Sequence, residues 1–425
     1  MTNLRYLSRF NRSFNGAKIN NSSLTPVAQS ERIKALDLLR GLAMFGVLWS
    51  NLNDWYGYVE PSNAFDNGLF WIQNNLIESR FYTLLCLLFG IGFGIQLLRA
   101  TDRGMDIKNT YFTRSLTLLV IGIIHAYFIW NADILSMYAL VAFSLILFRK
   151  SSTRNILIAA ILIWFLAPEF VGRALRLVGW NQPFTTSILY SKSSDWILGH
   201  GSWLQIEAVR ISSIVEWMGR FALRFYGSIL ATFLMGLWAT KSGYMMRVIE
   251  DPKTTRRLLL ISVIAAAIGY LSYAYFASLW PPLKIRPTGI TDPYFWYPRQ
   301  LVMRIFDWST EGTAVAYAAI LILLLQKFRT SRLFNPLAAT GRMALTTYLT
   351  QSVVCTLLFY GYGLGWYDKV SFTGKFVITI ILFACQMVIS SWWLKRFRFG
   401  PVEWLWRRLS YGRPLRMCVD EKPIV

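Results

Sequence analysis

The sequence has few charged residues, little histidine and little cysteine. Charged residues make up 16% of the 425 residues, against roughly 25% in ordinary soluble proteins. The chain has only two histidines, and its four cysteines stand singly without a C-x-x-C pair, so neither a cysteine metal cage nor a redox motif is indicated. The cysteines are Cys86, Cys355, Cys385 and Cys418. This composition excludes a disulfide scaffold and argues strongly against a soluble enzyme.

Hydrophobic residues, by contrast, are abundant. They make up 55% of the chain, aromatic residues make up 16%, and the mean hydropathy is +0.39. Apolar segments of about 20 residues recur, which is the length that crosses a bilayer as a helix. Since lipid leaves no partner for open backbone groups, each segment is expected to be helical. The sequence therefore predicts an all-α polytopic membrane protein with about ten transmembrane helices, at 36–55, 80–99, 111–130, 133–149, 155–172, 222–240, 257–279, 309–326, 343–363 and 375–394.

The basic residues fix the expected orientation. The net charge is +22, and 30 of the 44 Lys and Arg residues fall on the side of the chain that holds both termini. Because basic residues accumulate on the cytoplasmic side, both termini are expected there, in a bacterial cytoplasmic (inner) membrane. The charge therefore does not imply a nucleic-acid partner, and membrane lipids are the expected partners.

Three parts are expected along the chain. Residues 1–30 read as a disordered basic cytoplasmic tail, 31–395 as a single transmembrane domain, and 396–425 as a cytoplasmic interfacial helix with a basic tail. The connections 56–79, 173–221 and 280–308 are expected to form an extracytoplasmic cap of ordered loops.

Two charged residues open the first predicted span. Asp37 and Arg40 are three residues apart and share a helix face, so they are expected to pair. A cation held by a carboxylate near the cytoplasmic face is suited to binding a phosphate-bearing ligand. The alternative is a purely structural helix-end pair.

His125 lies inside the third predicted span. It is about 14 residues from the cytoplasmic start, or roughly 21 Å along a helix. A tight hairpin would bring Asp133 to the imidazole, fix its tautomer and raise its basicity. His125 is therefore the candidate general base, with Asp133 as its orienting partner. The alternative is a buried histidine that is merely hydrogen-bonded.

Further polar side chains lie toward the outward ends of the predicted spans. Ionisable groups at membrane depth usually face a cavity or a partner, so these residues are expected to line one polar chamber with His125 and to bind substrate or stabilise an oxyanion. The alternative is a set of interfacial anchors and snorkelling arginines. The chamber residues are Arg80, Glu216, Arg220, Arg224, Asp307 and Glu311, with Asp133 beside His125, and Asn51 at the outward end of the first span is a further expected substrate contact.

Two spacings concern helix packing. Thr347 and Gln351 are four apart in the ninth span, where they are expected either to bond across to another helix or to line a tunnel as substrate contacts. Gly90 and Gly94 form a G-x-x-x-G face that favours close helix packing. Although the surrounding string resembles a glycine-rich phosphate loop, no strand precedes it, so that interpretation is poor.

Taken together, several separated stretches resemble the YeiB-like family of bacterial membrane proteins, which is classed as a domain of unknown function. The resemblance covers residues 32 to 412, and Thr347 departs from the asparagine expected at its position. The stretches are 32–41 with Asn51, 80–94, His125 with 133–135 and 138–139, 341–346 with Tyr348, Gln351 and Ser352, and 400–401 with 403–404.

The YeiB-like family looks distantly similar to transmembrane acyltransferases, and the shared element is the L-D-x-x-R-G opening of the first span. This similarity implies transfer of an acyl group from cytosolic acyl-CoA, as co-substrate, to a small-molecule, glycan or lipid-borne hydroxyl or amine on the far side. No metal is expected. The alternatives are a transporter or permease for a small polar or amphipathic solute and a non-catalytic partner in an envelope complex, and the oligomeric state stays open.

Overall fold

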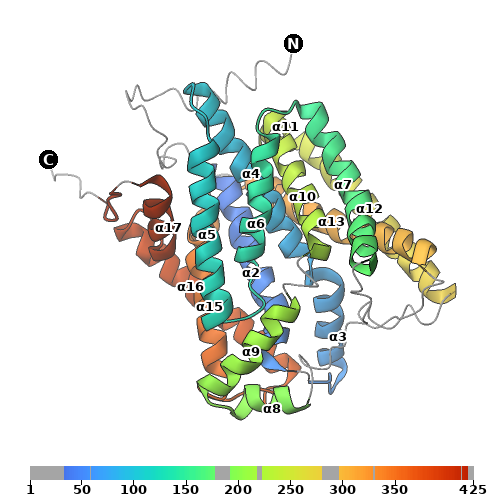
Figure 1. The fold of residues 1–425 in the computed structure, drawn as a ribbon, viewed down its shortest axis with the longest axis vertical. Helices are drawn as coiled ribbons and strands as arrows, with labels where there is room; N and C mark the ends of the chain where they lie inside the picture. The colour runs from blue at the N-terminus through green and yellow to red at the C-terminus, as the bar shows by residue number, and fades with distance from the viewer. Residues whose placement is uncertain are drawn as a thin grey trace.

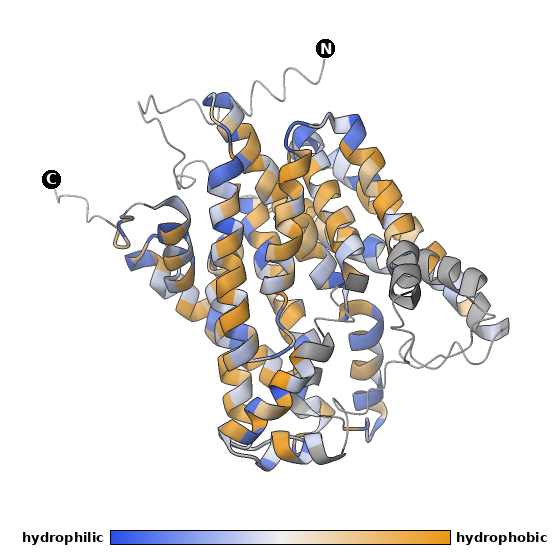
Figure 2. Cartoon of the chain, viewed as in Figure 1, coloured by the Kyte–Doolittle hydropathy of each residue, from blue (hydrophilic) through white to orange (hydrophobic). Residues whose placement is uncertain are grey.

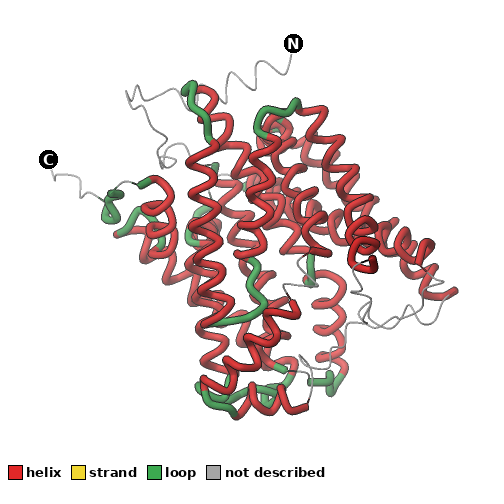
Figure 3. Tube along the Cα trace, viewed as in Figure 1, coloured by secondary structure: helices red, strands yellow, loops and turns green. Residues whose placement is uncertain are grey.

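The computed structural model describes residues 33–57, 59–177, 192–217, 223–279, 296–328, 331–412 and 414–419. Within these ranges the chain is built from helices and loops, with one isolated bridge between Phe397 and Cys418 (Figures 1 and 3). The all-α class is therefore confirmed. The expected tail at 1–30 and most of the expected cap loop at 280–308 lie outside the described residues.

Each of the ten predicted spans coincides with a helix. These helices are α2 (Lys34–Tyr56), α4 (Arg80–Asp102), α5 (Lys108–Phe128), α6 (Leu135–Leu145), α7 (Thr153–Leu177), α10 (Leu223–Lys241), α12 (Pro252–Leu279), α13 (Trp296–Lys327), α15 (Ala344–Phe359) and α16 (Phe372–Arg396). The shorter elements are α3 (Ala64–Ile72), η2 (Gln73–Ile77), η3 (Ile146–Phe148), α8 (Lys192–His200), α9 (Trp203–Trp217), α11 (Tyr244–Glu250), α14 (Phe334–Arg342) and α17 (Pro401–Tyr411).

By length and composition, five described segments are able to cross a membrane. Three shorter apolar helices, Leu135–Phe148, Thr153–Ala167 and Ala344–Phe359, accompany them. A membrane protein is thus supported, whereas ten crossings stay a prediction. The five segments are Ala64–Asp102, Lys108–Phe128, Pro252–Tyr275, Ile305–Lys327 and Phe372–Arg396.

Successive connections alternate between the two ends of the bundle. The turn between α4 and α5, the start of α7 and helix α11 lie at the upper end in Figure 1, whereas α3, α8 and α9 lie at the lower end. Apolar residues dominate the helices, and hydrophilic ones are found at the turns of both ends (Figure 2). Helices α4, α10 and α13 therefore start at the lower end, and α7 starts at the upper end.

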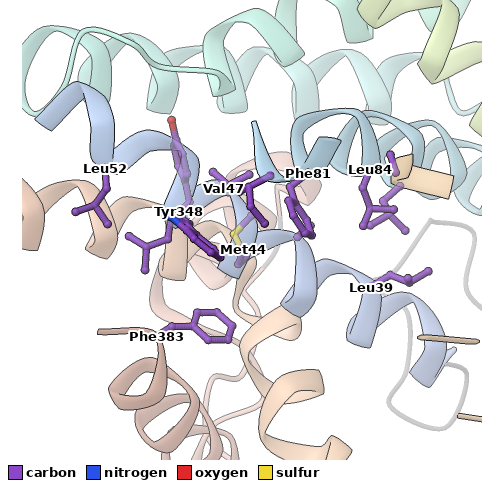
Figure 4. Close-up of a cluster of buried hydrophobic side chains, with 14 of the residues drawn as sticks. Leu39, Met44, Val47, Leu52, Phe81, Leu84, Tyr348 and Phe383 are labelled. Atoms are coloured by element: carbon purple, nitrogen blue, oxygen red, sulfur yellow. The ribbon is translucent and has the colours of Figure 1, made fainter. Parts of the chain in front are cut away.

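Helix α2 supplies much of the main core. Its Leu38, Val47 and Leu48 are fully buried. Leu39, Met44, Val47 and Leu52 of α2 lie in one cluster with Phe81 and Leu84 of α4, Tyr348 of α15 and Phe383 of α16 (Figure 4).

Glycines allow α4 and α10 to approach closely. A Cβ on Gly90 would collide with the carbonyl oxygen of Phe233, and one on Gly236 would collide with that of Leu87. Gly94 meets Thr240 on the same face. The packing face predicted from the G-x-x-x-G spacing is therefore confirmed.

Candidate functional site

A cavity of about 240 Å³ lies among α2, α4, α5, α6, α14, α15 and α17. Apolar and aromatic side chains form most of its wall, but four arginines and two acids also face it. The excess of cations makes this cavity suited to an anionic ligand. The six charged residues are Asp37, Arg40, Arg114, Arg342, Glu403 and Arg407.

The predicted pair at the start of α2 is present and lines this cavity. Arg40 Nη1 donates to Asp37 Oδ1 at 2.9 Å, and Asp37 is only 6% exposed. The Arg40 side chain is 30% exposed, so the pair holds a cation at the cavity wall.

Helix α17 contributes a part of the wall that the sequence analysis did not assign to the site. The Arg114 guanidinium carbon lies 3.7 Å from the centroid of the Trp406 ring, a cation–π contact, and Trp406 Nε1 donates to the Arg114 carbonyl oxygen at 2.9 Å. The Glu403 carboxylate accepts from the backbone N–H and the hydroxyl of Thr346, at 2.9 and 2.5 Å. These bonds fasten α17 to α5 and α15.

Burial raises the pKa of the Glu403 carboxyl, because desolvation outweighs the opposing hydrogen bonds from Thr346. The sequence stretch Gly400-Pro401-x-Glu-Trp contains Glu403 and could have indicated it as a site residue. Pro401 occupies the first turn of α17, where its missing N–H costs nothing, and Glu403 follows in the same turn.

His125 and Asp133 meet as the sequence predicts. His125 Nδ1 lies 2.8 Å from Asp133 Oδ1, and each side chain is 1% exposed. The other carboxyl oxygen, Asp133 Oδ2, accepts from the backbone N–H of Ser136 at 2.7 Å, which caps the start of α6. A carboxylate on the Nδ1 side places the proton there and leaves the Nε2 lone pair available. Nε2 has no hydrogen-bond partner among the described residues.

Tyr348 connects this dyad to the cavity. Its ring lines the cavity and has its centroid 5.2 Å from that of the His125 ring. Its hydroxyl accepts from the backbone N–H of Ile134 at 3.3 Å, directly after Asp133. On another side of the imidazole lies Trp130, with centroids 6.3 Å apart. The dyad therefore lies one aromatic ring behind the arginine-lined cavity.

The structure does not bring Arg80 to this site. Its guanidinium donates to the carbonyl oxygens of Glu78 and Asn74 at 2.6 and 3.2 Å, and to the Tyr270 hydroxyl at 2.8 Å. These bonds fasten the turn before α4 to α12. Arg80 therefore does not share a chamber with His125, because it faces α12 and not α5.

Glu311 lies at a second cavity, where its carboxyl accepts from Trp164 Nε1 at 2.5 Å. Arg220 lies outside the described residues, and of Arg224 only the backbone position in α10 is described.

Two amides predicted as substrate contacts, Gln351 and Asn51, are buried. Gln351 is 1% exposed, and its amide donates to Gln386 Oε1 at 2.9 Å and to the Met44 carbonyl at 3.4 Å. It joins α15 to α16 and α2, which is the first of the two roles expected for it. Asn51 is buried on α2, and neither amide lines the first cavity.

Across the part of the chain that the structure describes, no three His, Cys, Asp or Glu residues gather as metal ligands would. The functional groups at the site are the His125 imidazole, carboxylates, the Tyr348 phenol and guanidinium groups.

The fold and this cavity define a helical membrane protein with a buried histidine–aspartate dyad beside an arginine-lined chamber. Residues 239–413 match the family described as "Protein of unknown function (DUF418)". The chain is 32% identical to the "Uncharacterized protein YxaH" of Bacillus subtilis, over 92% of this chain and 97% of that protein. It is 30% identical to the "Uncharacterized protein YeiB" of Escherichia coli, over 89% of this chain and 96% of that protein.

The chain therefore belongs to this YeiB-like family of unknown function. An uncharacterized 39.9 kDa protein of Bacillus acidopullulyticus is 25% identical over 94% of this chain and 99% of its own length. No solved structure matches the chain.

Proposed function

We propose that this protein is a membrane acyltransferase that takes an acyl group from acyl-CoA on the cytoplasmic side. The acceptor is a hydroxyl or amine on an extracytoplasmic or lipid-borne molecule. The observation that carries the proposal is the buried His125–Asp133 dyad, which lies one aromatic ring from an arginine-lined cavity and whose Nε2 has no hydrogen-bond partner in the described part of the chain.

The arginines of the first cavity provide the donor site. Coenzyme A carries several phosphate charges, and guanidinium groups bind phosphate through paired N–H donors. Arg342 is one of them, and its Nε has no hydrogen-bond partner among the described residues. Arg40 keeps its position through Asp37, so the pair presents a fixed cation at the cavity wall.

The dyad provides the chemistry. His125 Nε2 removes the proton from the acceptor hydroxyl or amine as its oxygen or nitrogen attacks the thioester carbonyl carbon. The carbon–sulfur bond then breaks, and the thiolate of coenzyme A takes the proton from the imidazolium. Asp133 holds the imidazole and stabilises its charged form. Movement of the Tyr348 ring opens the path between the cavity and the imidazole, and its hydroxyl is a donor for the developing oxyanion.

Replacing the proposed base tests this mechanism. Purified protein in proteoliposomes is incubated with radiolabelled acetyl-CoA and longer acyl-CoAs, and label is followed onto lipid, added acceptor or protein. His125→Asn keeps a side-chain amide toward Asp133 but removes Nε2, so transfer should fall by about 10²- to 10⁴-fold. Thermal unfolding checks that the variant is folded.

The other histidine supplies the matched control. His200 lies exposed in α8, where its ring stacks on Trp196. His200→Asn should keep wild-type transfer. Full transfer by folded His125→Asn protein would refute the mechanism, and solute uptake without consumption of the acyl donor would favour a transporter instead.

A further inference from the structure

Helices α5 and α6 are joined by a short connection that carries part of the dyad. The His125 carbonyl oxygen accepts from the backbone N–H groups of Ile129 and Trp130, both at 2.9 Å, and these bonds close the C-terminal end of α5. The chain then reverses, Asp133 follows, and α6 begins at Leu135. The distance between His125 and Asp133 therefore depends on how closely the start of α6 approaches the end of α5.

Asp133 is held through both of its carboxyl oxygens. Oδ1 lies 2.8 Å from His125 Nδ1, and Oδ2 accepts from the backbone N–H of Ser136 at 2.7 Å. The second bond ties the carboxylate to the first turn of α6. A shift of that turn away from α5 would therefore carry the carboxylate away from the imidazole.

The residue that faces this turn is Gly122, which lies three positions before His125 on α5 and shares its helix face. A Cβ on Gly122 would overlap the Ser136 nitrogen, and it would lie 2.8 Å from Ser136 Cα and 2.9 Å from Asp133 Oδ2. Non-bonded carbon atoms pack at about 3.5–4.0 Å. Two of the three atoms belong to the backbone, so no side-chain rotation relieves the overlap. Only glycine fits at this position while α6 keeps its place.

Glycine in the interior of a helix needs a packing reason, because it loses more conformational freedom on folding than alanine does. Gly90 on α4 meets the Phe233 carbonyl oxygen, so its reason is the approach of α10. Gly122 differs, because the atoms that it meets are the dyad carboxylate and the backbone that bonds this carboxylate. The close approach at Gly122 therefore acts on the dyad itself.

The approach of Asp133 determines where the imidazole carries its proton. A neutral imidazole has one N–H, either at Nδ1 or at Nε2, and the hydrogen bond made by one nitrogen selects the tautomer. Asp133 accepts at Nδ1, whereas His125 Nε2 has no hydrogen-bond partner among the described residues. The Nδ1–H tautomer therefore depends on the contact with this one carboxylate.

We infer that Gly122 is a positioning residue for the dyad. Because it has no side chain, the first turn of α6 lies against α5, and Asp133 holds the proton of His125 on Nδ1. This role rests on the proposed function, since a general base needs its lone pair on Nε2. In Gly122→Ala protein the methyl group displaces the turn by about 1 Å, which breaks the contact between carboxylate and imidazole.

Nitrogen-15 NMR measures the position of the proton directly. The chain has only two histidines, so protein labelled at histidine gives two sets of ring signals. His200 is exposed and supplies a reference, and His125→Asn protein assigns the signals. At about pH 8.5, where an ordinary imidazole is neutral, wild-type His125 should show a protonated Nδ1 and an unprotonated Nε2. Gly122→Ala should lower the ratio of Nδ1–H to Nε2–H by about tenfold or more.

Three further variants separate positioning from general packing. Gly92→Ala is the matched control, because its methyl group meets no atom within 4 Å, and it should leave the spectrum unchanged. Asp133→Glu, added to Gly122→Ala, lengthens the acid by one methylene, or about 1.5 Å, and should restore the wild-type ratio. Asp133→Asn adds no volume, but its amide can donate to Nδ1, so it should move the proton to Nε2 even if Gly122→Ala protein does not fold.

The inference is overturned if folded Gly122→Ala protein keeps the wild-type ratio, or if Asp133→Asn leaves the proton on Nδ1. A lowered ratio that the longer acid does not restore would equally refute positioning, since it would show a general packing defect. These spectra report the proton on the ring and not acyl transfer. Wild-type protein with Nδ1–H and the expected variants, but without transfer, would refute the proposed function and leave the role of Gly122 intact.

Discussion

At the scale of single residues, sequence separation decides which contacts are predictable. Only eight positions separate His125 from Asp133, so a short hairpin brings them together and the 2.8 Å contact follows from local reasoning. Arg114 and Trp406 are 292 positions apart, and nothing local indicates that α17 returns to α5. Charge within a predicted span drew attention to Asp37 and Arg40, which line the first cavity, but it did not distinguish them from Arg80, whose bonds fasten α4 to α12.

Removing one cavity arginine should weaken donor binding more than turnover. Hydrogen bonds to charged groups contribute about 1.5–3 kcal/mol, so Arg342→Gln should raise the KM for acyl-CoA by about 10- to 100-fold with a smaller change in kcat. Steady-state kinetics at two salt concentrations measure both parameters. Arg256→Gln, an exposed change at the start of α12, is the control and should leave KM unaltered. If the Arg342 variant kept the wild-type KM, Arg342 would not be part of the donor site.

At the scale of helices, the sequence predicts which segments are helical and in what order they follow, but not which neighbours each helix packs against. Apolar length and backbone satisfaction identified all ten helices, and glycine spacing identified the face between α4 and α10. The short helices α8, α9 and α14 were not predicted, because their polar and apolar residues are mixed and their burial depends on neighbouring spans.

Two glycines on α4 make a matched test of helix packing. Gly90→Ala places a methyl group against the Phe233 carbonyl, and overpacking of this kind costs about 1–3 kcal/mol. Gly92→Ala meets no atom within 4 Å, so it should be neutral or slightly stabilising through helix propensity. Thermal unfolding in detergent compares the two. Equal losses of stability would contradict close α4–α10 packing.

The docking of α17 should depend on pH through Glu403. Its pKa is raised above the ordinary 4.5, so the docked state holds the proton more tightly than the undocked state does. This contribution is fully present below about pH 4.5 and is lost as pH rises through the raised pKa. Hydrogen exchange in residues 401–411, corrected for intrinsic rate, should therefore accelerate with pH. Glu403→Gln should remove that dependence, and a flat wild-type profile would contradict this account.

At the scale of the whole molecule, the asymmetry of basic residues predicts the orientation. The structure separates alternate connections to opposite ends of the bundle but contains no membrane (Figure 1). The placement of the termini in the cytoplasm is therefore a prediction that rests on charge alone.

Native Cys418 provides a probe of that orientation. It is exposed, whereas Cys86 and Cys355 are buried, so replacing Cys385 by Ser leaves one accessible thiol. A membrane-impermeant maleimide should label Cys418 in spheroplasts only after permeabilisation. Ser202 lies at the opposite end of the molecule. The Ser202→Cys variant, made in a protein that also carries Cys385→Ser and Cys418→Ser, should be labelled without permeabilisation. The reverse labelling pattern would show that the orientation in the membrane is opposite to the predicted one.

The position of α17 in the chain has a consequence for biosynthesis. Glu403, Trp406 and Arg407 complete the wall of the first cavity, yet they follow α16, after every apolar span has emerged from the ribosome. All apolar spans of a nascent chain can thus be inserted into the bilayer while the wall of the first cavity is still incomplete. The first cavity can therefore bind a ligand only after insertion, when α17 packs against α5 in the first half of the protein.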